Sequence, residues 1–520
     1  MAATPQVTYE TFAAPEPEAQ SFRAALARLE GSLGERHPFY LDGVAQRGAE
    51  WIDERSPADE RVLVGSFAAA TPGDLDRAVA AARAFAPAWT AVEWPERVRL
   101  VQGVSGAIAD RRHELAAILA YEIGKPLLEA LGEVDECTVL IDWYCEQMAA
   151  GGGFRTEMGP AGGAERTWSV LRPYGVWAVI GPFNFPMALL LGPIAAALLA
   201  GNTVLAKPSP YGYLSGHAVY ELFRQAGVPA EALQLVTIPD ACLGERLYGH
   251  PGLDGLTFTG SHATGMRVFH GFSREYPRPA ICEMGGKNPA IVTASADLRK
   301  AALGVARSAF GFSGQRCSGC SRVLVAREVH DEFLGLLQER RREVRLGSPL
   351  DPDTQIGPVI SPESVRRLLD AAAECRAAGW PVDGGRRLAE GELRFGNYAE
   401  PTLAAIPGDS RLLREELFTP FVAVRAVASF GEALELANGL VFGLTAGLYA
   451  EDPEEIERFE RTVRAGVVYV NREAGATTGA WPGIQSFGGW EGSGSTGRGA
   501  GGLYYLQQYM REQSLTVVDR

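Results

Sequence analysis

A cysteine with the features of a nucleophile stands in the motif GQRCS, which spans residues 314–318. Arg316 directly precedes Cys317. A fixed positive charge and nearby backbone N–H groups favour the thiolate, which is the reactive form of a cysteine. Because free cysteines are also common as small buried core residues, the motif alone leaves a structural role open.

Two further motifs contain side chains that suit acyl chemistry. Glu283 begins EMGGKNP (residues 283–289) after an apolar run, so its carboxyl group could be partly desolvated, with the raised pKa of a general base. The alternative is a solvated carboxylate at the end of a strand. Asn184 lies between two prolines and two aromatic residues in PFNFP (residues 182–186). An amide held in this way could stabilise an oxyanion.

Two polar motifs directly follow predicted strands, namely KPSP at residues 207–210 and FTGS at residues 258–261. Open α/β sheets bind ligands outside the carboxyl ends of their strands. We therefore expect Lys207 and Ser261 to lie near a ligand.

Two other patterns are interpreted as chance matches. Residues 492–497 fit GxGxxG, but no convincing strand precedes them and no βαβ unit follows. Cys317 and Cys320 form a CxxC without a second pair or partner histidines, so we predict no metal site. A redox pair stays possible, although a nucleophile beside an incidental cysteine fits better.

The elements that must position these side chains alternate between strand and helix, which indicates parallel sheets covered by helices. Residues 1–60 are interpreted as an arm or an irregular lead-in, and a hairpin is expected within residues 157–170. Helices are expected from residue 74, over 95–112 and over 113–123. The first alternating set has strands at 177–180, 203–206, 233–237 and 255–259, with helices near 187–199, 212–226 and 241–249. The second set has strands at 290–292 and 322–326, with helices at 297–311 and 328–345.

Composition excludes several classes of protein. The chain has 520 residues and a net charge of −14, and 46% of its residues are hydrophobic. This is typical of a folded globular protein of about three lobes and argues against nucleic-acid binding. Seven scattered cysteines favour a reducing compartment. The uncharged residues 178–200 are interrupted by glycines and prolines, so a buried strand, turn and helix fit better than a membrane span. We predict a soluble, cytoplasmic protein.

In this order, the motifs resemble those of the aldehyde dehydrogenase superfamily, with similarity from about residue 75 to residue 516. PFNFP, KPSP, FTGS, EMGGKNP and GQRCS are followed by ELFTP (416–420) and FGG (487–489). The resemblance implies a Rossmann-type cofactor domain (residues 1–154 and 173–282) and an α/β catalytic domain (283–480). It also implies a small β oligomerisation hairpin with the C-terminal tail (155–172 and 481–520), which would join strands across a homodimer.

The resemblance also implies a role for each catalytic residue. Cys317 would attack an aldehyde, and the Asn184 side chain and the Cys317 backbone N–H would hold the oxyanion. Glu283 would activate the water that hydrolyses the thioester. Its presence favours hydrolysis over transfer to coenzyme A. The implied residues for an NAD or NADP cofactor are Ile180, Lys207, Ser209, Gly260, Ser261, Gly265, Glu416 and Phe418.

The loop at residues 475–489 is similar to that of 1-pyrroline-5-carboxylate (L-glutamate γ-semialdehyde) dehydrogenases. By this likeness, the backbone N–H groups of Gly479 and Ala480 and the Ser318 hydroxyl would bind the substrate carboxylate. Phe185 and Phe487 would clamp the aliphatic stem. Exposed amides do form anion-binding nests, although a glycine-rich loop can also be a simple tight turn.

Some positions depart from the family pattern. Pro210 stands where many NAD-preferring relatives have an acidic residue, so a 2′-phosphate would meet no like charge and NADP could be accepted. Thr419, Met284 and Ser486 also replace more usual residues. The alternatives are a dehydrogenase for another small aldehyde, a coenzyme A-acylating enzyme and a non-catalytic nucleotide-binding or structural paralogue.

Overall fold

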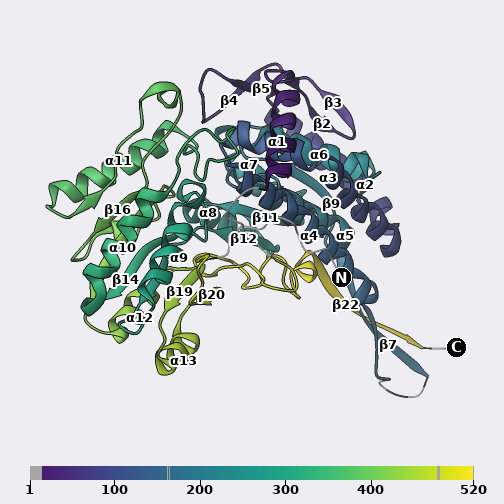
Figure 1. The fold of residues 1–520 in the computed structure, drawn as a ribbon. Coiled ribbons are helices and arrows are strands. Elements are labelled where there is room, and N and C mark those ends of the chain that lie inside the picture. The colour runs from purple at the N-terminus through teal and green to yellow at the C-terminus, as the bar shows by residue number, and fades with distance from the viewer. Residues whose placement is uncertain (1–14, 161, 163, 477–480, 519–520) are drawn as a thin grey trace.

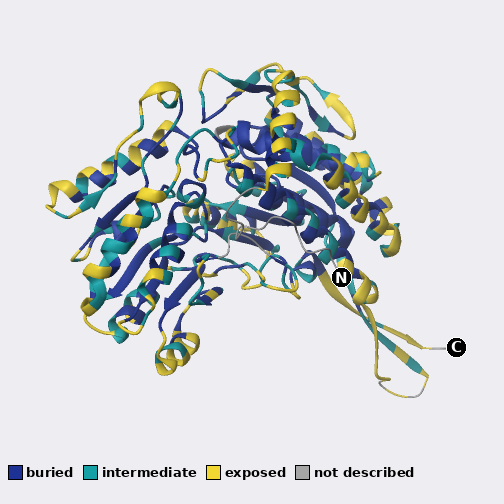
Figure 2. Cartoon of the chain, in the orientation of Figure 1, coloured by how far each residue is buried: buried dark blue, intermediate teal, exposed yellow. Residues whose placement is uncertain are grey.

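The computed structural model describes residues 15–160, 162, 164–476 and 481–518. Its main body has two lobes, each built on a seven-stranded sheet of described residues, and a narrow arm projects from the first lobe (Figure 1). The strands of both sheets are largely buried between helices (Figure 2).

The sheet of the first lobe has the order β12-β11-β8-β9-β10-β2-β3. Its first five strands are parallel, and β2 and β3 add an antiparallel edge. The central strands are continuous apolar runs, as expected when both faces are covered. The strand bounds, in chain order, are Phe39–Leu41, Val44–Gln46, Val176–Ile180, Thr203–Lys207, Leu233–Leu235, Gly255–Gly260 and Ala280–Met284 for β2, β3, β8, β9, β10, β11 and β12.

Helices pack on both faces of this sheet. They are α1 (Glu16–Glu30), α2 (Pro72–Ala91), α3 (Trp94–Ile123), α4 (Leu127–Ala150), α5 (Ala188–Ala200), α6 (Tyr213–Gln225), α7 (Asp240–Tyr248) and α8 (His262–Phe272). The strand β8, a turn and the 13-residue helix α5 account for the long uncharged segment, as predicted. None of the helices among the described residues combines the length and the apolar composition that crossing a bilayer requires.

The sheet of the second lobe has the order β15-β16-β17-β14-β13-β19-β20 and is parallel apart from β15. Its strands, in chain order from β13 to β17 and then β19 and β20, are Asn288–Val292, Cys320–Ala326, Val382–Asp383, Thr402–Ala405, Phe421–Val427, Thr445–Tyr449 and Val467–Val470. The helices are α9 (Leu298–Phe310), α10 (His330–Glu343), α11 (Pro362–Ala377), α12 (Phe430–Asn438) and α13 (Pro453–Thr462).

The arm is a three-stranded antiparallel sheet of β6 (Arg155–Met158), β7 (Glu165–Pro173) and β22 (Met510–Val518). The predicted hairpin is therefore confirmed, and the tail pairs with β7 of its own chain along nine residues of each strand. Smaller pairings join β18 (Phe442–Gly443) to β21 (Trp490–Glu491), and β1 (Arg36–His37) and β4 (Trp51–Arg55) to β5 (Leu63–Ala68).

Two predictions about the N-terminal part were wrong. The lead-in is not irregular, because α1 and β1–β4 lie within it. The two helices expected at 95–112 and 113–123 form one 30-residue helix, α3. His113 disfavours a helix only weakly, and the first strong stop is Gly124, which adopts φ +72°.

Candidate active site

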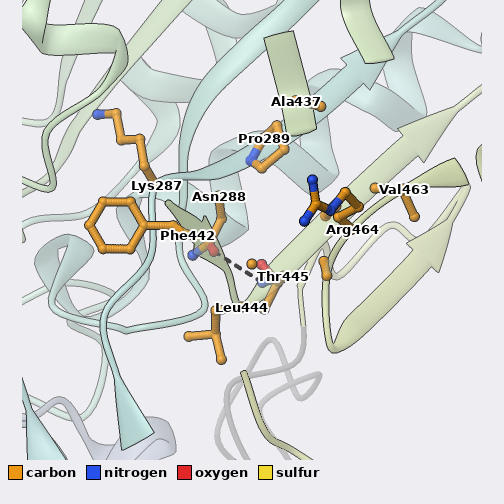
Figure 3. A pocket seen from close by; sticks show the side chains of 12 residues that line it. Lys287, Asn288, Pro289, Ala437, Phe442, Leu444, Thr445, Val463 and Arg464 are labelled. Atoms are coloured by element: carbon orange, nitrogen blue, oxygen red, sulfur yellow. Dashed lines mark hydrogen bonds between the residues drawn. The ribbon is translucent and has the colours of Figure 1, made fainter. Parts of the chain in front are cut away.

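The nucleophile candidate Cys317 lies in a tight loop between α9 and β14. Phe312 and Ser313 both have positive φ, at 45° and 53°, so the loop enters this position in a strained conformation. Asn288, at the start of β13, holds the loop from the other side. Its Nδ2 donates to the carbonyl oxygens of Cys317 at 2.6 Å and Gly319 at 3.0 Å, and its Oδ1 accepts from the Thr445 N–H (Figure 3).

The surroundings of Cys317 favour the neutral thiol and not the thiolate, which corrects the expectation from Arg316. Burial raises the pKa of Cys317 to about 12, and the nearby carboxylates Glu416 and Glu283 add to this effect. The Ser318 backbone N–H does favour the thiolate but is outweighed. The Arg316 guanidinium is itself buried and forms an ion pair with Glu129 on α4.

Asn184 lies beside this loop, in the turn between β8 and α5. Its side chain is 4% exposed, and its Nδ2 donates to the Gln315 carbonyl oxygen at 3.0 Å. The amide thus faces the peptide segment that leads directly into Cys317. An amide donor beside the nucleophile is the arrangement that oxyanion stabilisation requires.

Glu283 lies near the carboxyl end of β12 and is half-buried. Burial raises its pKa to about 8, and a hydrogen bond of 3.3 Å from the Gly489 N–H opposes the shift. The prediction of a desolvated carboxyl group is confirmed, and the solvated alternative is not. The C-terminal segment supports this strand end, because the Met284 N–H donates to the Ser493 carbonyl oxygen at 2.9 Å.

The residues implied for the cofactor gather at adjacent strand ends. Ile180, Lys207 and Gly260 are the last residues of β8, β9 and β11, which are neighbours in the sheet. Lys207 and Ser209 are buried, and the Ser209 Oγ accepts from the Tyr211 N–H at 3.2 Å.

The start of α8 forms one wall of this region. Ser261 is an exposed N-cap residue whose Oγ accepts from the Thr264 N–H at 3.4 Å. Gly265, one turn later, allows a close approach to β12, because a Cβ there would lie 2.4 Å from the Met284 Sδ. A helix N-terminus close to strand ends is suited to a phosphate group.

Glu416 and Phe418 approach the same region from the second lobe. The Glu416 Oε1 accepts from the Gly286 N–H at 3.0 Å, and burial raises the pKa of Glu416 to about 7. Phe418 adopts a φ of 55° and packs edge-on against Phe183, with ring centroids 5.8 Å apart. A helix N-terminus, a buried lysine and a buried carboxylate are groups that fit the phosphates and ribose hydroxyls of a nicotinamide dinucleotide.

The predicted substrate residues are placed only in part. Phe185 is 2% exposed and packs against Lys125 and Phe312, and Phe487 is half-buried, with its backbone paired to Ala500. Ser318 is buried, and its hydroxyl has no hydrogen-bond partner among the described residues. Gly479 and Ala480 lie outside the described residues, so their proposed role stays a prediction.

Sequence reasoning missed the residues that hold the site together. Asn288 lies in the motif EMGGKNP but received no role, although an amide two residues before the expected apolar strand at 290–292 was a visible signal. Lys125 and Glu133 form a fully buried ion pair beside Asn184. Lys125 lies in the connection before α4 and Glu133 lies on α4, so their eight-residue spacing gave no local pattern. The described cysteines, including Cys320, are free thiols.

With this geometry in place, the class of the protein follows from comparison. Residues 44–515 match the aldehyde dehydrogenase family, and the chain belongs to it. A 1-pyrroline-5-carboxylate dehydrogenase from Geobacillus sp. (strain WCH70) is 31% identical over 96% of each chain. A 1-pyrroline-5-carboxylate dehydrogenase from Thermus, solved with bound NAD, is 32% identical, with a TM-score of 0.92 over 100% of each chain. A betaine aldehyde dehydrogenase from Staphylococcus aureus in complex with NAD+ is 26% identical, with a TM-score of 0.88 over 96% of this chain and 97% of that one.

Proposed function

We propose that the protein oxidises an aldehyde to a carboxylic acid with NAD or NADP, and that the aldehyde is L-glutamate γ-semialdehyde. The observation that carries the proposal is the meeting of three groups from separate elements. Cys317 lies in the strained loop before β14, Asn184 faces that loop, and the Glu283 carboxyl group lies near enough to raise the pKa of the Cys317 thiol.

The residues divide the reaction between them. The Cys317 thiol loses its proton to water and attacks the aldehyde carbon as the thiolate, and the Asn184 amide with the Cys317 backbone N–H stabilises the oxyanion. NAD or NADP supplies the hydride acceptor when bound. Loss of the hydride leaves a thioester on Cys317. The Glu283 carboxylate takes a proton from water, the resulting hydroxide cleaves the thioester, and the acid leaves as the thiol is restored.

The substrate assignment rests on likeness and on one feature of the site. Two of the relatives named above are 1-pyrroline-5-carboxylate dehydrogenases, and this chain matches them over nearly their whole length. The buried Ser318 hydroxyl, directly after the nucleophile, has no hydrogen-bond partner among the described residues. An oxygen of the substrate could be that partner. Backbone amides and a hydroxyl bind a carboxylate without a buried countercharge.

The cofactor residues proposed are those gathered at the strand ends, with Lys207 and Glu416 on the ribose hydroxyls and Ser261 on a phosphate. Neither Ser209 nor Pro210 presents a carboxylate to the adenosine ribose. Because no such like charge rejects a 2′-phosphate, both NAD and NADP are accepted.

The protein acts as a homodimer in the cytoplasm. The arm projects from the body, and its outer strands β6 and β22 leave two sheet edges free for another chain (Figure 1). The free thiols of the described cysteines suit a reducing compartment.

A substrate panel tests the proposal. NAD(P)H formation is measured with L-glutamate γ-semialdehyde and with uncharged aldehydes of similar length, and the product is analysed as acid or thioester. We expect the semialdehyde to give the highest kcat/KM, free glutamate as product and no activity in Cys317→Ala. Equal kcat/KM for the uncharged aldehydes would contradict the substrate, and full turnover of Cys317→Ala would contradict the mechanism.

A further inference from the structure

Lys125 is a buried cation that the mechanism above does not use. It lies in the short connection between α3 and α4 and is 0% exposed. Its Nζ donates to the main-chain carbonyl oxygen of Asn184 at 2.7 Å. The same ammonium group lies 3.7 Å from the ring centroid of Phe185 and 4.6 Å from that of Phe312. One cation therefore contacts both the oxyanion segment and the strained nucleophile loop.

Glu133 on α4 completes this contact from the other side. It forms an ion pair with Lys125 through Oε2, while its Oε1 accepts from the N–H groups of Met187 at 2.8 Å and Ala188 at 3.1 Å. These amides begin α5, directly after the segment that contains Asn184. The pair thus fixes this segment at Asn184 and again at the start of the helix that follows.

The same helix also anchors the nucleophile loop. Glu129, one turn before Glu133 on α4, forms the ion pair with Arg316. Residues four apart lie on one face of a helix, so a single helix face holds both components of the oxyanion site. The hydrogen bond from the Asn184 Nδ2 to the Gln315 carbonyl oxygen joins the two components directly.

A buried ion pair contributes little net stability, because its desolvation offsets much of the attraction between the charges. Taking two charges out of water costs several kcal/mol per ion, and well-packed apolar residues of similar volume are often as stabilising. Burial lowers the pKa of Lys125, and Glu133 and Glu129 oppose this effect. What an apolar pair cannot do is donate to a main-chain carbonyl oxygen and hold two aromatic faces in a fixed direction.

We propose that Lys125 is a positioning residue for the oxidation proposed above. It fixes the Asn184 main chain and, through Phe312, the nucleophile loop, so that the Asn184 amide and the Cys317 backbone N–H point to one oxyanion position. The inference rests on the proposed function, because the oxyanion is formed in that reaction.

The first test is Lys125→Met, which keeps much of the side-chain volume and removes the charge. A misdirected oxyanion donor lowers kcat by about 100-fold, while the Kd for NAD stays within about twofold of wild type. Lys300→Met, at a half-exposed lysine on α9, is the matched control and keeps full activity. A kcat within about threefold of wild type for Lys125→Met would overturn the proposal.

A loss of folding stability must be separated from a misplacement of the oxyanion donors, because Lys125→Met leaves Glu133 buried and unpaired. The double variant Lys125→Met/Glu133→Gln removes both charges. We expect it to recover most of the wild-type Tm while kcat stays low. Recovery of kcat together with Tm would show a purely structural role and overturn the proposal.

A double-mutant cycle with Asn184→Ala tests the route of the effect. If Lys125 acts through Asn184, Lys125→Met lowers kcat in the Asn184→Ala background much less than in wild type. Full additivity of the two substitutions would contradict this route.

The rate at which iodoacetamide alkylates Cys317, without aldehyde or cofactor, measures how accessible the nucleophile loop is, independently of turnover. We expect Lys125→Met to alkylate several-fold faster than wild type, because Phe312 and the loop lose their anchor. An unchanged alkylation rate would overturn the anchoring of the loop. If wild type oxidises no aldehyde, the proposed function fails, and the alkylation rate still decides whether Lys125 holds the nucleophile loop.

Discussion

At the scale of single residues, burial works against ionisation of both the nucleophile and the general base. The Cys317 thiol and the Glu283 carboxyl group are both shifted toward their protonated forms, with pKa values of about 12 and about 8. The same burial that suppresses ionisation strengthens every electrostatic contact once a charged intermediate forms. We therefore expect the rate of turnover to depend on the fraction of Glu283 that is deprotonated.

The pH dependence of turnover should report Glu283. A general base acts only when deprotonated, so the hydrolytic step should accelerate as pH rises through the Glu283 pKa of about 8. We expect steady-state kcat to rise between pH 7 and pH 9. In Glu283→Gln, kcat should fall by roughly 10²- to 10⁴-fold, and what turnover is left should lose this rise. A wild-type kcat that is flat over this range would contradict Glu283 as the base of the limiting step.

Asn288 offers a second residue-scale prediction. Asn288→Asp keeps the acceptor for the Thr445 N–H but replaces two amide donations to the loop by repulsion between oxygens. We expect kcat to fall by at least about tenfold, with a lower Tm, because the Cys317 and Gly319 carbonyl oxygens lose their partner. Asn438→Asp is the control, since Asn438 also bridges two backbone groups, Thr462 and Arg464, at an exposed site. Equal effects of the two substitutions would show that Asn288 does not act on the nucleophile.

At the scale of elements, the sequence predicted most strands and helices that carry the site. Apolar runs such as Val176–Ile180 are long, uninterrupted and followed by a motif, so both the strand and its ligand-binding end could be identified. Cys317, Glu283 and Asn184 could be identified as candidates for the same reason, because each lies in a local motif at a strand end or loop.

Contacts between distant segments could not be predicted. The ion pair of Arg316 with Glu129 joins residues 187 positions apart. It neutralises the positive charge that was expected to favour the Cys317 thiolate. The support of Glu283 by Gly489 spans 206 positions. The boundary at His113 failed for the opposite reason, since a cluster of charged residues looks like a helix end but does not break a helix.

The position of α8 against β12 gives a prediction for an element. Gly265→Ala would place a Cβ 2.4 Å from the Met284 Sδ, so either the Met284 side chain or α8 must move. We expect a higher Kd for NAD and a lower Tm. Gly106→Ala, at an exposed position in α3 with no atom within 4 Å of the added Cβ, should instead raise stability by about 0.5–1 kcal/mol. Unchanged NAD binding in Gly265→Ala would show that the close approach of α8 does not shape the cofactor site.

At the scale of the whole molecule, two buried carboxyl groups meet where the N-terminal segment packs on the first lobe. Glu54 on β4 is 5% exposed, and Glu122 near the end of α3 is 1% exposed. Glu122 accepts from the N–H groups of Leu214 and Ser215, at the start of α6. Burial raises the pKa of both, for Glu122 to about 7, and the Glu122 charge raises the pKa of Glu54 further.

This pair predicts a loss of stability at alkaline pH. Both folded-state pKa values lie above the unfolded value, so the stabilisation is full below about pH 4.5 and is lost as pH rises through the folded values. We expect Tm to fall by several degrees between pH 6 and pH 9. Glu54→Gln should flatten this dependence, because an amide can donate to the Glu122 carboxylate. The measurement is thermal unfolding across this pH range, and an equally steep loss in Glu54→Gln would exclude the pair as its cause.

The central claim is that Cys317 carries the acyl group of the substrate and that Glu283 directs its hydrolysis. Intact mass spectrometry of Glu283→Gln, mixed with L-glutamate γ-semialdehyde and NAD, tests it most directly. The account predicts a burst of NADH and an acyl adduct that peptide mapping places on Cys317, absent from Cys317→Ala. A Glu283→Gln protein that turns over at the wild-type rate without an adduct, or one acylated at another residue, would contradict it.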